Sequence, residues 1–187
     1  MNLYNVKYVL SPWPMATPRR FESLGQFSDV HLYRNPDVLP RAFLVGRARV
    51  VADAAEALST LAGGGFDPSN EVILFDRSSA PLSDMHEAST ATLLQYGTNR
   101  VVVRVEAAAS GLLVLSDTWY PGWVATVDGK PTPVLRANHT MRAVAVSAGS
   151  HLVDFEFRSH SIAVGSVVSL LAFAAMGLAA WRLPQAA

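Results

Sequence analysis

The chain has 187 residues, a formal net charge of zero from 15 basic and 15 acidic side chains, and no cysteine. Neutrality argues against a nucleic-acid partner, because no basic surplus is available to neutralise phosphates. The absence of cysteine excludes disulfides, thiolate metal sites and cysteine nucleophiles.

The first part of the chain predicts a small α+β unit over residues 1–76. Short apolar runs, each bounded by Pro, Gly or Asn-Pro turn signals, predict strands at residues 5–11, 30–34, 41–51 and 71–75. After the third run, Asp53 predicts the N-cap of a helix, because apolar residues then recur at helical spacing. Gly63-Gly64-Gly65 predicts its end. Residues 77–90, rich in Ser and Ala, predict a linker.

Residues 91–158 predict an antiparallel β-sandwich, so that the fold class is mainly β. Turn signals separate seven short β-rich runs, at residues 93–96, 100–107, 111–117, 122–128, 131–136, 141–146 and 151–158. Regular spacing of this kind is typical of a sandwich. Asp128-Gly129 between two runs predicts a type I′ hairpin turn, which needs positive φ at both central residues.

Residues 162–182 predict one C-terminal transmembrane helix, with the lipid bilayer as partner. Residues 162–181 contain no charged residue, His, Asn, Gln or Pro. A helix of that length is about 30 Å long, which matches the hydrocarbon core of a bilayer. Trp181 and Arg182 then supply an interface aromatic and a snorkelling cation. The small residues Gly165 and Ser169 would let another membrane helix approach.

The first eight residues lack the apolar run of a signal peptide. Taken without other information, this favours a tail-anchored protein whose soluble part is cytoplasmic. The alternative is that the chain is the tail of a longer membrane protein.

The sequence predicts no catalytic, metal-binding or cofactor-binding residue. The five histidines form no pair at helical spacing and no metal-ligand motif, and no P-loop or nucleophile elbow is present. The tripeptide Asn138-His139-Thr140 fits the N-glycosylation pattern.

The densest aromatic cluster, Trp119-Tyr120-Pro121-Gly122-Trp123, is the candidate ligand site. Its rings could stack on a sugar, with Asp117 and Arg136 binding hydroxyl groups. Alternatively, one Trp is buried in the core and Pro-Gly makes a turn. The pattern favours core packing and leaves glycan binding open.

Several motifs in order resemble the bacterial YfhO-type membrane proteins. The central one is Tyr120-Pro121-Gly122-Trp123 followed by Val127-Asp128-Gly129 and Pro131. The resemblance continues through residues 136–138, 142–144 and 148–151, and upstream it includes residues 5–10, 33–36 and 39–43. In this family, as here, a last strand passes straight into a final membrane helix.

The resemblance implies a cell-envelope context. The family is similar to GT-C glycosyltransferases, which use a polyprenyl-phosphate sugar donor and whose acidic catalytic residues lie in an early loop between N-terminal helices. This chain has no such helices, so no catalytic residue carries over. We therefore expect a non-catalytic, extracytoplasmic accessory region with the last membrane helix, at the cell membrane. Its partners would be other transmembrane helices and a glycan or lipid-linked sugar.

A self-standing, membrane-anchored carbohydrate-binding module is the alternative.

Overall fold

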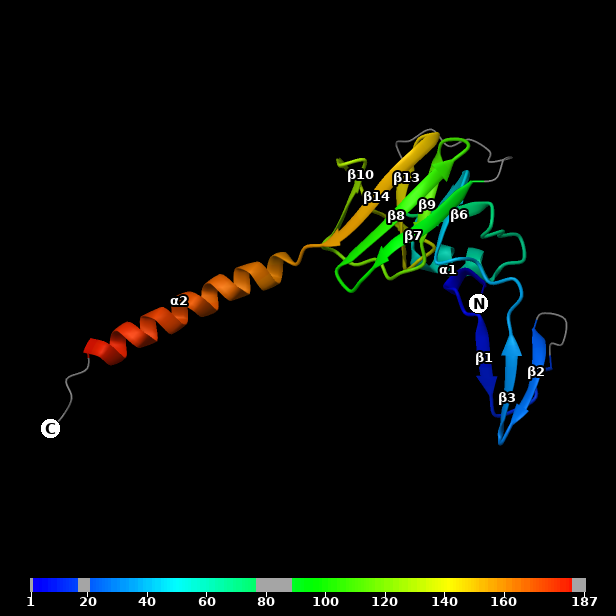
Figure 1. Ribbon diagram of the computed structural model, residues 1–187, viewed down its shortest axis with the longest axis horizontal. Helices are drawn as coiled ribbons and strands as arrows, with labels where there is room; N and C mark the ends of the chain where they lie inside the picture. Colours follow the sequence, from blue (N-terminus) through cyan, green and yellow to red (C-terminus); the bar gives the residue numbers. More distant parts are fainter. Residues whose placement is uncertain (1, 17–20, 77–88, 183–187) are drawn as a thin grey trace.

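The computed structural model describes residues 2–16, 21–76 and 89–182 (Figure 1). Most of the predicted linker, residues 77–90, lies outside the described residues. In chain order the elements are η1 (Asn2–Tyr4), β1 (Tyr8–Ser11), β2 (Glu22–Phe27), β3 (Val30–Arg34), β4 (Ala42–Val45), β5 (Arg47–Val50), α1 (Ala54–Ala62), β6 (Glu71–Leu74), β7 (Thr90–Tyr96), β8 (Arg100–Ala107), β9 (Gly111–Leu115), β10 (Trp123–Val127), β11 (Lys130–Thr132), β12 (Leu135–Ala137), β13 (Met141–Val146), β14 (Gly149–Phe157) and α2 (His160–Arg182).

Two sheets pack face to face and enclose the main hydrophobic core. One is a five-stranded antiparallel sheet with the order β11-β10-β14-β8-β7. The other has six strands in the order β4-β9-β13-β12-β6-β5, in which only the β5–β6 pair is parallel. Val103 and Phe155 of the first sheet share a buried cluster with Leu113 and Val144 of the second. The predicted mainly β class, with antiparallel sheets, is confirmed.

The six-stranded sheet is apolar on both faces. In β9, Leu113 and Leu115 face the five-stranded sheet, whereas Leu112 and Val114 belong to a second cluster together with Leu3 of η1. A strand buried on both faces reads as a continuous apolar run, as β9 does. Strands β4, β5 and β6 share this sheet with β9, β12 and β13. Strands from the two predicted units thus hydrogen-bond within one sheet.

Capping and turn residues in the sequence correctly predicted several ends of helices and strands. Asp53 caps α1 by accepting a hydrogen bond from the Glu56 backbone N–H at 2.8 Å. Asp128 and Gly129 have φ of 52° and 77°, as a type I′ turn requires. Gly63 ends α1, but with φ of −70° it takes an extended conformation instead of a left-handed cap.

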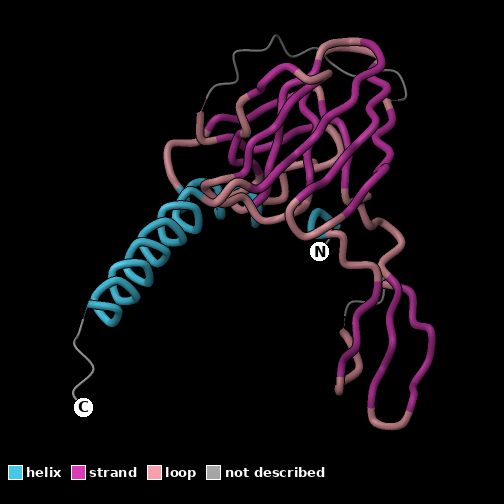
Figure 2. The backbone as a smooth tube through the Cα atoms, turned by 60° about the vertical axis from the view of Figure 1, so that its left-hand side comes forward, coloured by secondary structure: helices cyan, strands magenta, loops and turns pink. Residues whose placement is uncertain are grey.

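Two parts project from the sandwich (Figure 2). The first is a three-stranded arm with the order β1-β3-β2. Strand β2 was not predicted, because its sequence carries Gly25 and little apolar alternation, and all six of its residues are exposed.

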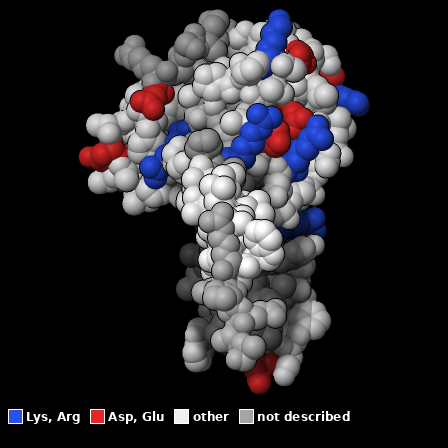
Figure 3. Space-filling model, turned by 90° about the vertical axis from the view of Figure 1, so that its left-hand side faces the viewer, with Lys and Arg blue, Asp and Glu red and all other residues white. Residues whose placement is uncertain are grey.

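The second projection is α2, which leaves the sandwich two residues after β14 ends. The predicted C-terminal helix is therefore confirmed. Among the residues that the structure describes, no helix is both long and apolar enough to cross a membrane, so the predicted span is not confirmed. Viewed from the helix side, charged side chains gather on the sandwich, while the described surface of the helix carries none (Figure 3).

Candidate functional site

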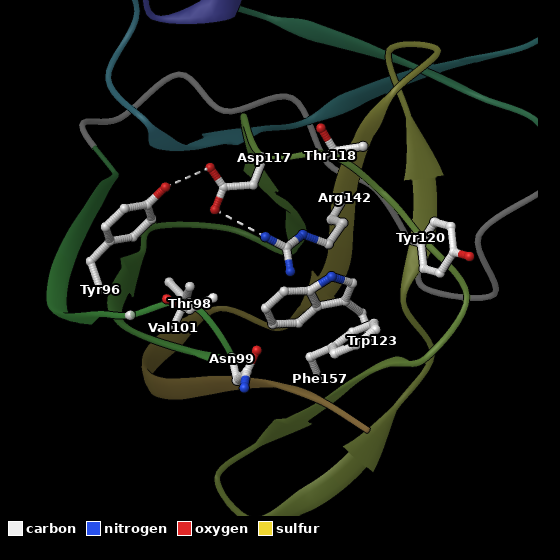
Figure 4. A pocket seen from close by; sticks show the side chains of 11 residues that line it. Tyr96, Thr98, Asn99, Val101, Asp117, Thr118, Tyr120, Trp123, Arg142 and Phe157 are labelled. Carbon is white, nitrogen blue, oxygen red and sulfur yellow. Dashed lines mark hydrogen bonds and ion pairs between the residues drawn. The ribbon is translucent and has the colours of Figure 1, made fainter. Parts of the chain in front are cut away.

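A pocket of about 780 Å³ lies at the end of the sandwich from which α2 leaves. Figure 4 shows the side chains that line it. The β7–β8 turn, the loop after β9, and the ends of β10 and β14 form its walls. Its lining residues are Tyr96, Gly97, Thr98, Asn99, Val101, Asp117, Thr118, Tyr120, Trp123, Arg142 and Phe157. Phe157 is the last residue of β14, so the pocket lies next to the start of α2.

The loop that carries Tyr120 is held against the end of β14 by a close backbone contact at Gly122. Its carbonyl accepts a hydrogen bond from the Arg158 N–H at 2.7 Å. Gly122 has φ of 111°, a region that residues with a Cβ rarely occupy. An added Cβ would lie 3.0 Å from the Phe157 ring and 3.1 Å from the Arg158 carbonyl oxygen. A glycine is therefore required here both for backbone conformation and for space.

Aromatic rings form one wall of the pocket. The centroids of Trp123 and Phe157 are 5.4 Å apart and those of Tyr120 and Phe157 are 6.3 Å apart. Both separations fall in the range of tilted aromatic pairs. Tyr120 is 62% exposed, whereas Trp123 and Phe157 are partly buried. The wall thus combines a partly buried ring pair with one ring that is largely open to solvent.

A charged cluster around Asp117 adjoins the aromatic wall, because its Arg142 lies over the Trp123 ring. Its Oδ1 accepts hydrogen bonds from Arg41 Nη1 at 2.9 Å and from the Tyr96 hydroxyl at 3.1 Å. Its Oδ2 accepts a hydrogen bond from Arg142 Nη2 at 2.9 Å. Two guanidinium groups therefore share a single carboxylate. Burial and the negative charge of Asp117 raise the pKa of Tyr96, so its hydroxyl stays protonated and can donate.

Arg142 is the least expected member of this cluster, because its side chain is only 2% exposed. The guanidinium carbon lies 3.7 Å from the centre of the Trp123 ring and 5.6 Å from that of Phe155. Its Nε and Nη1 atoms are buried and have no hydrogen-bond acceptor. Burial lowers the pKa of Arg142, while Asp117 opposes that shift. Arginine remains charged at any ordinary pH, so the pocket contains a buried cation.

The predicted ligand residues divide between two places. Asp117, Tyr120 and Trp123 line the pocket, whereas Trp119 and Arg136 do not. Arg136 instead lies over the Phe75 ring at 4.5 Å and near Trp119 at 5.8 Å, and it donates from Nε to the His139 carbonyl at 2.6 Å.

Arg41, Tyr96, Arg142 and Phe157 were not among the sequence candidates. A signal for Arg142 exists in β13. It shares the side of the strand that Val144 and Val146 place in the core, so the alternation puts a charge at an inward position. An inward charge requires a partner, and the partner could not be read from the strand itself.

The N-glycosylation pattern at Asn138 does not mark a surface site. Asn138 is fully buried, and its side-chain oxygen accepts a hydrogen bond from the Ile73 N–H at 2.9 Å. The amide therefore serves the packing of β12 against β6, and it is not accessible in the folded protein.

A chain of Ser, His and Asp side chains lies at the far end of β10. Ser147 Oγ is 3.0 Å from His151 Nε2, and His151 Nδ1 is 2.7 Å from Asp128 Oδ2. The other Asp128 oxygen accepts a hydrogen bond from the Leu152 N–H at 2.8 Å. This order resembles a hydrolytic triad, which also needs oxyanion donors and a substrate pocket. None of the three residues lines the pocket described above. Their contacts fasten the Asp128–Gly129 turn to β14.

No group of three or more His, Asp or Glu residues within the described ranges is arranged to hold a metal ion.

Comparison with known proteins gives one match. Residues 82–169, slightly less than half of the chain, match the model of the family described as bacterial membrane protein YfhO, which confirms the resemblance found in the sequence. The matched range includes every residue that lines the pocket. No curated protein and no solved structure gives a significant match to the chain.

Proposed function

We propose that this chain, similar over residues 82–169 to the bacterial membrane protein YfhO, is an extracytoplasmic, non-catalytic region that holds a glycan beside the membrane. It would serve a membrane protein implicated in glycosyl transfer to cell-envelope polymers. The observation that carries the proposal is the aromatic-walled pocket at the junction of β14 and α2.

The pocket has the two kinds of surface that a sugar needs. The ring faces of Tyr120 and Trp123 offer apolar contact for sugar C–H groups. The side chains of Asn99, Thr98 and Thr118 lie around the same cavity and can donate to or accept from hydroxyl groups. Its volume falls within the range usual for small-molecule sites, which is roughly 300–1,000 Å³.

The proposal places α2 in the membrane. Its large described side chains are at least half exposed, including Leu170, Leu171 and Phe173 at 66–69%. A helix whose described apolar side chains are this exposed requires an apolar surface to cover them. A Cβ added at Gly165 or Gly177 would meet nothing within 4 Å, so these positions are open to other membrane helices.

A binding experiment tests the pocket. Isothermal titration of neutral oligosaccharides into the full chain in detergent should show binding that Tyr120→Ala and Trp123→Ala weaken. Trp13→Ala is the matched control, because Trp13 is 74% exposed on the arm and lies outside the pocket. Tyr120→Ala is the more informative variant, since an exposed ring contributes little to folding. Binding that is unchanged in both pocket variants would contradict this site.

A labelling experiment tests the location. Because the chain has no cysteine, one introduced by Lys130→Cys at the exposed start of β11 is a unique probe. A membrane-impermeant maleimide added to intact cells should label this cysteine, whereas one introduced by Ala187→Cys should be labelled only after lysis. The reverse pattern would contradict an extracytoplasmic sandwich.

A further inference from the structure

We infer that the saccharide held in this pocket carries a negatively charged substituent and that Arg142 recognises it. This inference rests on the proposed function of the same pocket and specifies its ligand class. The ligand would be an acidic sugar, meaning a hexuronate or a sugar phosphate, which present the same chemistry to a guanidinium group.

The charge of the cluster supports an anionic ligand. Among the described residues that line the cavity, Asp117 and Arg142 are the ionic ones, and Arg41 contacts Asp117 from outside the lining. Two guanidinium groups against one carboxylate leave one positive charge uncompensated within the cluster. Because Arg142 is 2% exposed, bulk water screens that charge only weakly.

The unpaired donors support the same conclusion. Nε and Nη1 of Arg142 are buried without an acceptor, although buried polar groups are nearly always hydrogen-bonded. The surrounding rings of Trp123 and Phe155 offer only π faces to the guanidinium. A carboxylate or phosphate offers several oxygen acceptors, and one of them can accept a hydrogen bond from Nε or from Nη1, which lie on different edges of the guanidinium.

The geometry also predicts that Trp123 moves when the ligand binds. The Trp123 ring covers the guanidinium at 3.7 Å, so an anion can reach Nε or Nη1 only if the indole shifts. The Trp123 indole would then move off the Arg142 guanidinium and contact the sugar ring. This movement gives an optical readout, because indole emission responds to the loss of a neighbouring cation.

The test compares glucuronate, glucose 1-phosphate, glucose and inorganic phosphate as probes of the full chain in detergent. Titration calorimetry gives the affinity, and tryptophan emission compared with Trp123→Phe reports the indole. We expect glucuronate or glucose 1-phosphate to bind about tenfold or more tightly than glucose, and added salt to reduce that preference. Arg142→Lys keeps the charge but loses the fork of donors, and it should remove most of the preference.

Two further variants keep the test decisive if Arg142→Lys folds poorly. Arg41→Gln removes one positive charge from a side chain that is 37% exposed, and it should lower the preference for the acidic probes. Arg49→Gln is the control, because Arg49 pairs with Glu71 on the six-stranded sheet away from the pocket. Arg49→Gln should prefer the acidic probes over glucose to the same degree as the wild type does.

Equal binding of glucose and the acidic sugars by the wild-type chain would overturn the inference while leaving the glycan pocket in place. Inorganic phosphate that binds as tightly as glucose 1-phosphate would also overturn it, because the site would then recognise an anion without a sugar. Failure of every saccharide to bind, neutral oligosaccharides included, would instead overturn the proposed function.

Discussion

Each end of β10 lies beside an ion pair that contains an aspartate and beside a glycine with a positive φ, but the two ends differ in environment. At the pocket end, Asp117 pairs with Arg142, and Gly122 has a positive φ. At the far end, Asp128 pairs with His151, and Gly129 has a positive φ.

The environments differ in burial. The Arg142 side chain is 2% exposed and that of Asp117 is 14% exposed, whereas Asp128 is 48% exposed. An added Cβ at Gly122 would meet Phe157, but at Gly129 it would meet nothing within 4 Å. From this difference in burial we expect substitutions at the pocket end to lower the free energy of unfolding more than substitutions at the far end.

The largest expected effect comes from Asp117→Ala. It leaves the buried Arg142 cation without the carboxylate that accepts its hydrogen bond, which should lower the free energy of unfolding by about 3–5 kcal/mol. Urea denaturation measures this. Asp154→Ala is the matched control, because its partner Arg100 is 55% exposed, and the loss of such a solvent-exposed pair should lower the free energy of unfolding far less. Equal losses in the two variants would break the comparison.

The glycine pair gives the next effect. Gly122→Ala combines an unfavourable φ with close contacts to Phe157 and Arg158, and it should cost about 1–3 kcal/mol. Gly129→Ala should cost about 1 kcal/mol, because only the unfavourable φ opposes the added Cβ there. Thermal unfolding of both variants checks the order. A larger loss at Gly129 would show that the close approach at Gly122 is not the decisive factor.

The smallest effect is the acid dependence of the far end. The hydrogen bond from His151, followed by that from the Leu152 N–H, holds the pKa of Asp128 below its ordinary value. A carboxyl group with a lowered pKa stabilises the fold above its unfolded pKa of about 3.9, and this stabilisation is lost as the pH falls through the folded value. Asp128→Asn should therefore flatten the stability profile below about pH 4.

Urea midpoints of wild type and Asp128→Asn between neutral pH and acid measure this difference. Asp37→Asn is the control for replacing a carboxylate by an amide, because Asp37 lies between β3 and β4, whereas the Asp128–Gly129 turn lies between β10 and β11. Parallel profiles of the wild type and Asp128→Asn would contradict the coupling between Asp128 and His151.

Much of the strand pattern was predictable because its signals are local. β3, β8 and β13 begin and end where the apolar runs do, and the Asp128-Gly129 turn follows from residue type alone. The run at residues 131–136 proved to be two short strands, β11 and β12, which belong to different sheets. A local pattern cannot show such a change of sheet. The sheet that a strand joins depends on which distant strand offers it hydrogen-bonding groups.

The candidate site was predictable only in part. The cluster from Trp119 to Trp123 drew attention to a loop that lines the pocket, yet Trp119 and Arg136 lie outside the pocket. Arg142 was not foreseen, although its inward position in β13 is a sequence signal. Its partner Asp117 lies 25 residues away in the chain, and periodicity within a strand does not reveal such a pair.

The sequence by itself determined the mainly β class, the capped helix α1, the tight turns and an apolar C-terminal helix. Each of these depends on residue preferences and periods within a few neighbouring positions. Only the tertiary structure decided that β4, β5 and β6 join the sheet of β9, β12 and β13, and that Arg142 lies under Trp123 beside Asp117. These features depend on which surfaces are buried together, so the pairing of distant strands determines them.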